Sequence, residues 1–111
     1  MAKYENTLIG EFEEVVKHLE TDISNSGISM KLVDESNHTI GATKIAVRVY
    51  DKYFMRNGNR ASLSLTVVGD KSNIFISAIG AGGGSGVFLN FSLGAENEMV
   101  EIVKKSVEQM K

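Results

Sequence analysis

The stretch that decides the fold runs from Thr43 to Gly80 and reads TKIAVRVYDKYFMRNGNRASLSLTVVGDKSNIFISAIG. Apolar residues recur at every second position in two runs that flank an Asn-Gly pair: Ile45, Val47 and Val49, then Leu63, Leu65 and Val67. Such alternation is typical of antiparallel strands with one buried face and one wetter face. An Asn-Gly pair between two such runs is typical of a β-hairpin. The stretch therefore predicts the centre of an antiparallel sheet.

The same alternation predicts which side chains reach the open face of this sheet. On the first strand it places four residues opposite the apolar row: Lys44, Arg48, Tyr50 and Lys52. On the second strand it places small hydroxyl residues there: Ser62, Ser64 and Thr66. We therefore expect a shallow polar surface on which the charged and aromatic residues from Arg48 to Lys52 lie beside the two serines.

Two amphipathic segments flank this stretch. Apolar residues recur at helical spacing between Glu11 and Asn25, namely Phe12, Val15, Val16, Leu19 and Ile23. A second such stripe runs from Ala95 to Met110, formed by Met99, Ile102, Val103, Val107 and Met110. Acidic residues come at the start of each segment, where they favour the positive end of a helix dipole. Both segments are therefore predicted to be helices.

The remaining segments complete an α+β domain. Apolar or alternating runs predict strands at 4–9, 28–33 and 74–79 and an extended segment at 87–93, with polar turns at 34–38 and 69–73. The helices must bury their stripes against the apolar face of the sheet, which predicts a single domain over residues 1–111. It would be a two-layer sandwich of order β-α-β4(5)-α, with a curved antiparallel sheet, a meander of neighbouring strands and both helices on one face. This order resembles one half of the TATA-binding protein, a topological likeness that implies nothing about function.

Composition excludes several classes of protein. The chain has 111 residues, of which 42% are hydrophobic and 23% charged, and it contains no cysteine. Disulfides, thiolate metal sites and cysteine nucleophiles are therefore excluded. The sequence shows no signal peptide and no apolar run of about 18–20 residues, the length that a membrane-spanning helix needs. We expect a cytoplasmic protein with no membrane contact, and the sequence predicts no cofactor.

The charge is unevenly distributed. The net charge is −2, but five basic residues and one acid lie between Lys44 and Arg60, which gives that segment +4 and leaves −6 for the rest. Aromatic residues are interleaved with these cations, as in surfaces that bind anions, bases or other proteins. A solvated strand face that protects a sheet edge has the same composition. The candidate binding residues are Lys44, Arg48, Tyr50, Lys52, Tyr53, Arg56 and Arg60.

The glycine-rich segment from Gly80 to Gly86 is the one low-complexity stretch. A dinucleotide fingerprint that starts at Gly80 would require glycine or alanine at 85, where Ser85 stands, and no helix signal follows. The simpler interpretation is a flexible or bulged corner between strands. The alternative is a lid or an anion-binding nest of backbone amides. Its candidate residues are Gly82, Gly83, Gly84, Ser85 and Gly86.

Nothing in the sequence indicates a catalytic centre. His18 and His38 have no second histidine at helical spacing, so they form no helical metal pair. The clustered glutamates fall at predicted helix starts, where the dipole accounts for them. No serine lies in a Gly-x-Ser-x-Gly elbow, although a Ser–His–Asp triad can also assemble from residues far apart in the sequence. We therefore favour a protein that is not an enzyme and predict no metal site.

Three functions remain open. The preferred one is a non-enzymatic interaction module that uses the open sheet face and forms a homodimer. The second is a pocket between sheet and helices for a small apolar or anionic ligand, with Gly80–Gly86 as its lid. The third is weak nucleic-acid binding through residues 44–60, which the negative net charge disfavours.

Several runs in the chain resemble a family of small bacterial proteins of unknown function. They are Ala46-Val47-Arg48-Val49-Tyr50, Asn59-Arg60-Ala61-Ser62-Leu63 and Phe75-Ile76-Ser77-Ala78-Ile79, followed by the glycine-serine segment. The resemblance covers nearly the whole chain. It implies a bacterial, cytoplasmic, single-domain protein and brings no catalytic residue with it.

Overall fold

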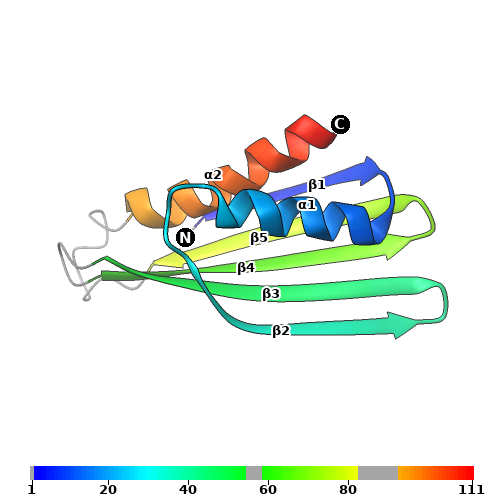
Figure 1. The fold of residues 1–111 in the computed structure, drawn as a ribbon, viewed down its shortest axis with the longest axis horizontal. Helices are drawn as coiled ribbons and strands as arrows, with labels where there is room; N and C mark the ends of the chain where they lie inside the picture. The colour runs from blue at the N-terminus through cyan, green and yellow to red at the C-terminus, as the bar shows by residue number, and fades with distance from the viewer. Residues whose placement is uncertain (1, 55–58, 83–92) are drawn as a thin grey trace.

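The computed structural model describes residues 2–54, 59–82 and 93–111, which contain five strands and two helices (Figure 1). Along the chain the elements are β1 Ala2–Ile9, α1 Phe12–Ser24, β2 Lys31–Ile40, β3 Thr43–Phe54, β4 Asn59–Asp70, β5 Asn73–Gly82 and α2 Leu93–Met110. The predicted α+β class is confirmed, with two helices packed on one open antiparallel sheet.

The five strands form a single sheet in the order β1-β5-β4-β3-β2, and every neighbouring pair is antiparallel. Strands β2 to β5 follow one another in space as they do in sequence, so the predicted meander is confirmed. β1 then pairs with β5, which makes β1 and β2 the two edges of the sheet.

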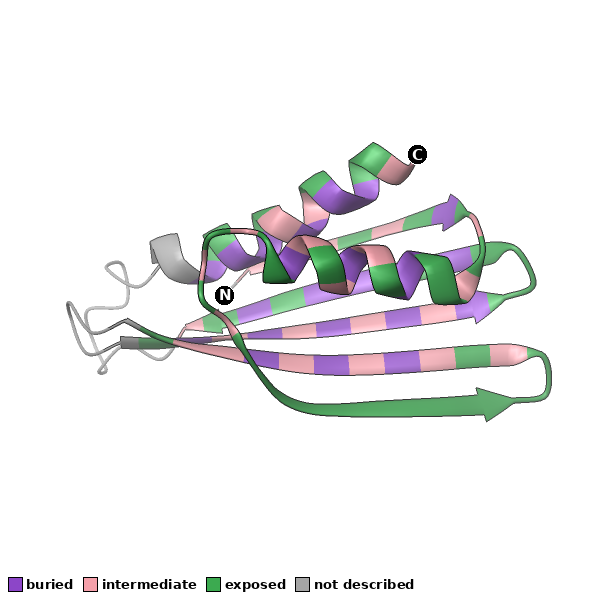
Figure 2. Ribbon diagram, viewed as in Figure 1, coloured by how far each residue is buried: buried purple, intermediate pink, exposed green. Residues whose placement is uncertain are grey.

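Both helices lie on the same face of the sheet (Figure 1). α2 packs on β1, β5 and β4, whereas α1 packs on α2 and β4. β2 extends past the helices, and all ten of its residues are exposed (Figure 2). The sheet therefore has a covered part, formed by β1, β5 and β4, and an overhanging part, formed by β3 and β2.

The hydrophobic core fills the space between the covered part and the helices. Side chains that are at most 2% exposed come from every layer: Leu19 and Ile23 of α1, Val103 and Val107 of α2, Leu63 and Leu65 of β4, and Ile74 and Ile76 of β5. Burial of each such side chain contributes roughly 1.5–3 kcal/mol. The helix stripes and the Leu63–Leu65 run belong to one buried cluster, as predicted.

The prediction for the segment around β2 is wrong in two respects. Residues 28–30 lie before the strand, and the residues predicted as a polar turn, Asp34 to His38, lie inside it. The turn comes later, at Gly41 and Ala42, where Gly41 has the positive φ of 60° that favours glycine. β2 buries neither face, so its strand residues need not alternate between apolar and polar. A register shift between Leu32 and Asp34 marks a β-bulge.

Two other boundaries differ from the prediction. Gly69 and Asp70 continue β4 and Asn73 begins β5, so the turn between them is reduced to Lys71 and Ser72. The final helix begins at Leu93 rather than at Ala95. The rest of the predicted extended segment, residues 87–92, lies outside the described residues.

The face assignment of β3 is also wrong. Arg48 pairs across the ladder with Leu65 and Tyr50 with Leu63, and residues directly opposite each other share a face. Because both leucines are in the core, Arg48 and Tyr50 face the helices, where both are buried. The apolar row of β3 instead shares the open face with the serines of β4. The row of β3 that faces the helices contains Arg48 and Tyr50, whereas its open-face row is apolar, so hydrophobicity alone predicts the wrong face.

Candidate functional site

A groove of about 720 Å³ separates α1 from the overhanging part of the sheet. Its α1 wall combines apolar and charged side chains, and its floor is formed by residues of β2 and β3 that are polar except for Ile45. Its lining includes Phe12, Val16, Lys17 and Glu20 of α1, Asn37 of β2, and Lys44 and Arg48 of β3. The groove exists because the helices cover only part of the sheet.

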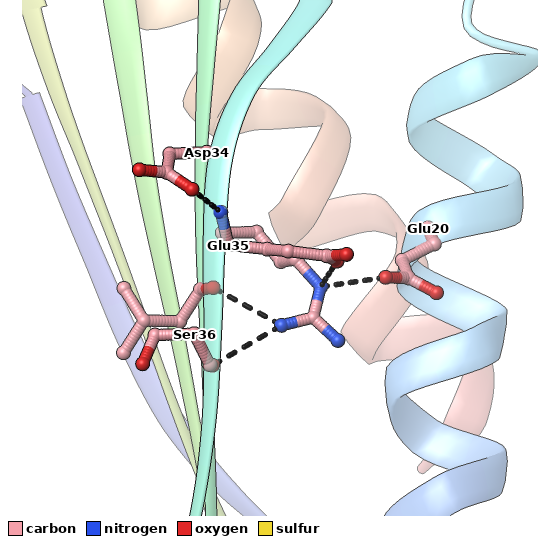
Figure 3. A network of polar contacts seen from close by, with 6 residues as sticks. Glu20, Asp34, Glu35 and Ser36 are labelled. Carbon is pink, nitrogen blue, oxygen red and sulfur yellow. Dashed lines mark hydrogen bonds and ion pairs between the residues drawn. The ribbon is translucent and has the colours of Figure 1, made fainter.

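Arg48 is the buried charge at this groove, and its side chain is only 8% exposed. Its Nε donates to Glu20 Oε2 at 2.7 Å and lies 3.1 Å from Glu35 Oε1. Its Nη1 donates to the backbone oxygens of Val47, at 3.0 Å, and Ser36, at 3.3 Å. Glu20 on α1 and Glu35 on β2 thus converge on one guanidinium from two elements (Figure 3). A buried cation requires such partners, because removal from water is costly.

Two polar atoms beside this network have no hydrogen bond to any described residue. They are the second terminal nitrogen of Arg48, Nη2, and the hydroxyl of Tyr50. Burial raises the pKa of the Tyr50 hydroxyl, and the negative charge of Glu20 raises it further. Tyr50 therefore stays protonated at neutral pH and can donate a hydrogen bond.

A second ion pair links α1 to β3. Lys44 Nζ donates to Glu13 Oε2 at 2.7 Å. A side-chain hydrogen bond with Glu11, followed by the one from Lys44, lowers the pKa of the Glu13 carboxyl to about 2. The same bond to Glu13 raises the pKa of Lys44. Glu11 also caps α1, because its carboxylate accepts from the backbone N–H groups of Glu13 and Glu14.

The structure brings some of the predicted binding residues together and separates others. The four residues from Lys44 to Lys52 lie on the helix side of β3. Tyr53 and Arg60 pair with each other on the open side, where Arg60 forms an ion pair with Asp51. Arg56 lies outside the described residues. Of the glycine-rich candidates, Gly82 ends β5, and 83–86 are outside the described residues.

Sequence reasoning missed the acidic partners of these cations. Glu13 and Glu20 are seven residues apart on α1, about 10.5 Å along a helix, and Lys44 and Arg48 are four apart on β3, about 13 Å along a strand. The two spacings are close enough for both ion pairs to form at once. The similar spacing of the two acids on the predicted helix and the two bases on the predicted strand was the sequence signal that could have indicated these ion pairs. Ion pairing also lowers the charge that this segment offers to a nucleic acid, so nucleic-acid binding remains a prediction that these contacts disfavour.

The open face carries a mixed surface whose rows follow from the ladder registers. From β1 to β2, the first row is Lys3, Ile79, Ser64, Val49 and Asp34, and the second is Glu5, Ser77, Thr66, Val47 and Ser36. The third is Thr7, Phe75, Val68, Ile45 and His38, and the fourth is Ile9, Asn73, Asp70, Thr43 and Ile40. β5 and β3 lie at equal distances on either side of β4, and so do β1 and β2. In most rows the two residues at such equivalent positions are similar in polarity or opposite in charge.

A hollow of about 690 Å³ lies beside the third and fourth rows, on the β1 side of β4, and its lining also includes the core residues Leu8 and Ile74 and the C-terminal Met110 and Lys111. On the open face its lining includes Ile9, Val68 and Phe75. Ile9 is 72% exposed and Phe75 is 37% exposed. On the β2 side of the same rows, Ile40 is 61% exposed. One end of the open face therefore exposes large apolar side chains on both sides of β4.

The histidines and acids form no metal centre among residues 2–54, 59–82 and 93–111, since no group of three potential ligands occurs there. His18 Nε2 lies 3.1 Å from Asp22 Oδ2, one helical turn away on α1. His38 lies on the open side of β2, opposite Ile45. Within the same ranges, no helix is both long enough and apolar enough to span a membrane.

Comparison with known proteins places the chain in a family. The model of the Family of unknown function (DUF6054) matches residues 1–111. The chain belongs to DUF6054. None of the curated proteins matches this DUF6054 chain. Among solved structures, the crystal structure of TTHA0849 from Thermus thermophilus is similar with a TM-score of 0.35 and 8% sequence identity, over 96% of this chain and 91% of that one.

Proposed function

We propose that this protein is a non-enzymatic interaction module that forms a homodimer through the open face of its sheet. The observation that carries the proposal is the symmetry of that face about β4. The face offers aliphatic and hydroxyl side chains, which suit contact with another protein surface. The occupant that best fits this pattern is a second copy of the chain.

Apolar contacts would form if the second sheet is turned by 180° about an axis along β4. β5 of one copy would then lie over β3 of the other, which brings Phe75 over Ile45 and Ile79 over Val49. Val68, on β4 itself, would meet its own copy. The hollow beside Phe75 would receive the exposed Ile40 and its neighbour Ile45. Two sheets that pack in this way lie about 10 Å apart.

The charges at the rim are also complementary in this arrangement. β1 of one copy would lie over β2 of the other, so that Lys3 meets Asp34 twice in the dimer. Because Lys3 and Asp34 stand on opposite edges of one sheet, they cannot pair within a single copy. Asp70 would meet its own copy, a like-charged contact in the fourth row, where water and salt screen it.

The decisive experiment is a charge exchange read by sedimentation equilibrium. Lys3→Glu and Asp34→Lys should each weaken the dimer several-fold, and the double variant should recover affinity. Val68→Glu, which places two carboxylates at the centre, should give a monomer. The control Lys105→Glu makes the same change of charge as Lys3→Glu on the exposed side of α2 and should leave the dimer intact. A wild-type protein that stays monomeric at all concentrations, or a double variant no better than its parents, would overturn the proposal.

A further inference from the structure

The groove between α1 and the overhanging part lies on the opposite side of the sheet from the proposed dimer contact. It offers about 720 Å³ and keeps one charged side chain, Arg48, more than nine-tenths buried at its floor. The groove and the proposed dimer contact share Ile45, but Arg48 and the α1 wall of the groove lie on the helix side of the sheet.

The guanidinium of Arg48 is buried and bound to backbone oxygens, whereas the carboxylates around it are partly exposed. Nη1 is fixed by two backbone oxygens of neighbouring strands, those of Ser36 and Val47. The side chains of Glu20 and Glu35 are 36% and 50% exposed, so both can rotate into solvent. Nη2 makes no hydrogen bond within the described residues. On the edge of the guanidinium formed by Nε and Nη2, the two carboxylates therefore share Nε, whereas Nη2 is unpaired within the described residues.

We propose that this groove binds a small amphiphilic molecule through its oxyanion, and that Glu20 occupies the oxyanion position when the groove is empty. The ligand oxyanion would displace the carboxylates of Glu20 and Glu35 from Nε and bind both Nε and Nη2 of Arg48, the bidentate geometry that arginine favours. Lys17, whose side chain forms no ion pair within the described residues, lies on the same wall and adds a second positive charge at the rim.

The apolar side chains on the α1 wall of the groove determine the chemistry of the part of the ligand that does not contact Arg48. Phe12 and Val16 lie on the side of α1 that faces the groove, about two helical turns and one helical turn before Glu20. A hydrocarbon chain attached to the oxyanion can lie along these side chains while the oxyanion reaches Arg48. The shared chemistry is thus a carboxylate or phosphate ester on an apolar body.

A purely structural role for Arg48 predicts different behaviour. If Arg48 only ties α1 to β2 and β3, then Glu20→Gln removes one tie and creates no binding site. If Glu20 stands in for a ligand, the same substitution removes a competing negative charge and should tighten ligand binding. The sign of the change in affinity therefore separates the two roles.

The experiment is an NMR titration of the full-length protein that follows the Arg48 Nε–Hε signal. The probes are octanoate, octyl phosphate and the uncharged control octanol. Saturable shifts of the Arg48 signal and of the α1 amides with at least one anion, but not with octanol, are the expected result. The two anions distinguish a carboxylate ligand from a phosphate ligand.

Variants complete the test. Glu20→Gln should lower the dissociation constant several-fold, and Arg48→Met should abolish the saturable shifts. Glu14→Gln, an equal loss of charge at an exposed position of α1 outside the groove lining, should have no effect. Should Arg48→Met fail to fold, the Glu20 and Glu14 pair still decides the matter. No saturable shift with either anion, an equal response to octanol, or weaker or unchanged binding by Glu20→Gln overturns the proposal. Repeating the titration on Val68→Glu separates this result from that of self-association.

Discussion

The covered and overhanging parts of the sheet are held together by different forces. In the covered part, residues such as Leu63, Leu65 and Ile76 are at most 1% exposed and belong to one hydrophobic cluster. In the overhanging part, β2 is exposed along its whole length, and α1 is linked to β3 by the ion pairs of Arg48 and Lys44. The comparison indicates that hydrophobic burial stabilises one part, whereas strand pairing and ion pairs hold the other.

The largest expected change in the free energy of unfolding comes from shortening a buried side chain of the covered part, compared with an exposed side chain of the overhanging part. Leu65→Ala should lower the free energy of unfolding by about 2–5 kcal/mol, because a cavity remains in the core. Val33→Ala removes two methyl groups from a residue of β2 that is 56% exposed and should cost less than about 0.5 kcal/mol. Urea unfolding monitored by circular dichroism measures both. Similar losses for the two variants would contradict the division into two parts.

A smaller effect is expected where glycine permits a close approach in the covered part. A Cβ at Gly80 would lie 2.9 Å from the backbone oxygen of Glu96 and 3.0 Å from Val100 Cγ2, so α2 would have to shift. Gly80→Ala should therefore cost about 1–3 kcal/mol. At Gly41, in the turn of the overhanging part, alanine would meet no atom within 4 Å but would keep a φ of 60°. Its expected cost is about 1 kcal/mol from backbone strain alone, and thermal unfolding of both variants checks the order.

The smallest effect concerns the exposed ion pair between Glu13 and Lys44. The pKa of Glu13 falls from its ordinary value of 4.5 to about 2, so any stability it contributes is present above pH 4.5 and is lost as the pH falls toward 2. NMR titration of the Glu13 carboxyl should give this pKa. Lys44→Met should raise it only in part, since the hydrogen bond with Glu11 is the larger cause. A complete return to 4.5 in Lys44→Met would show that α1 and β3 are coupled more strongly than the contacts indicate.

Sequence patterns predicted the covered part well. The stripes of both helices and the alternation of Leu63, Leu65 and Val67 identify residues that are buried, because each of these elements has one face against the core. β3 and β4 pair antiparallel as predicted, with Phe54 opposite Asn59, and the predicted Asn-Gly turn between them lies outside the described residues. Where burial selects the residues on one face, the pattern and the structure agree.

The overhanging part could not be predicted in the same way. β2 is stabilised by its ladder with β3 and buries no face, so its polar residues from Asp34 to His38 resemble a turn. Arg48 is buried through partners on α1 and β2, and a contact between residues 28 positions apart leaves no periodic trace in the sequence. The candidate residues Arg48 and Lys44 were therefore recognised, but their face and their acidic partners were not.

The bulge near Leu32 makes the β2 edge a poor template for another strand. A long bare sheet edge is a template on which further chains can add without limit, as they do in fibrils. In β2 the bulge interrupts the regular row of backbone donors and acceptors, and Lys31, Asp34 and Glu35 place charges on both sides of it. Lateral growth from this edge is thereby discouraged, so a contact through the broad face can end in a particle of finite size.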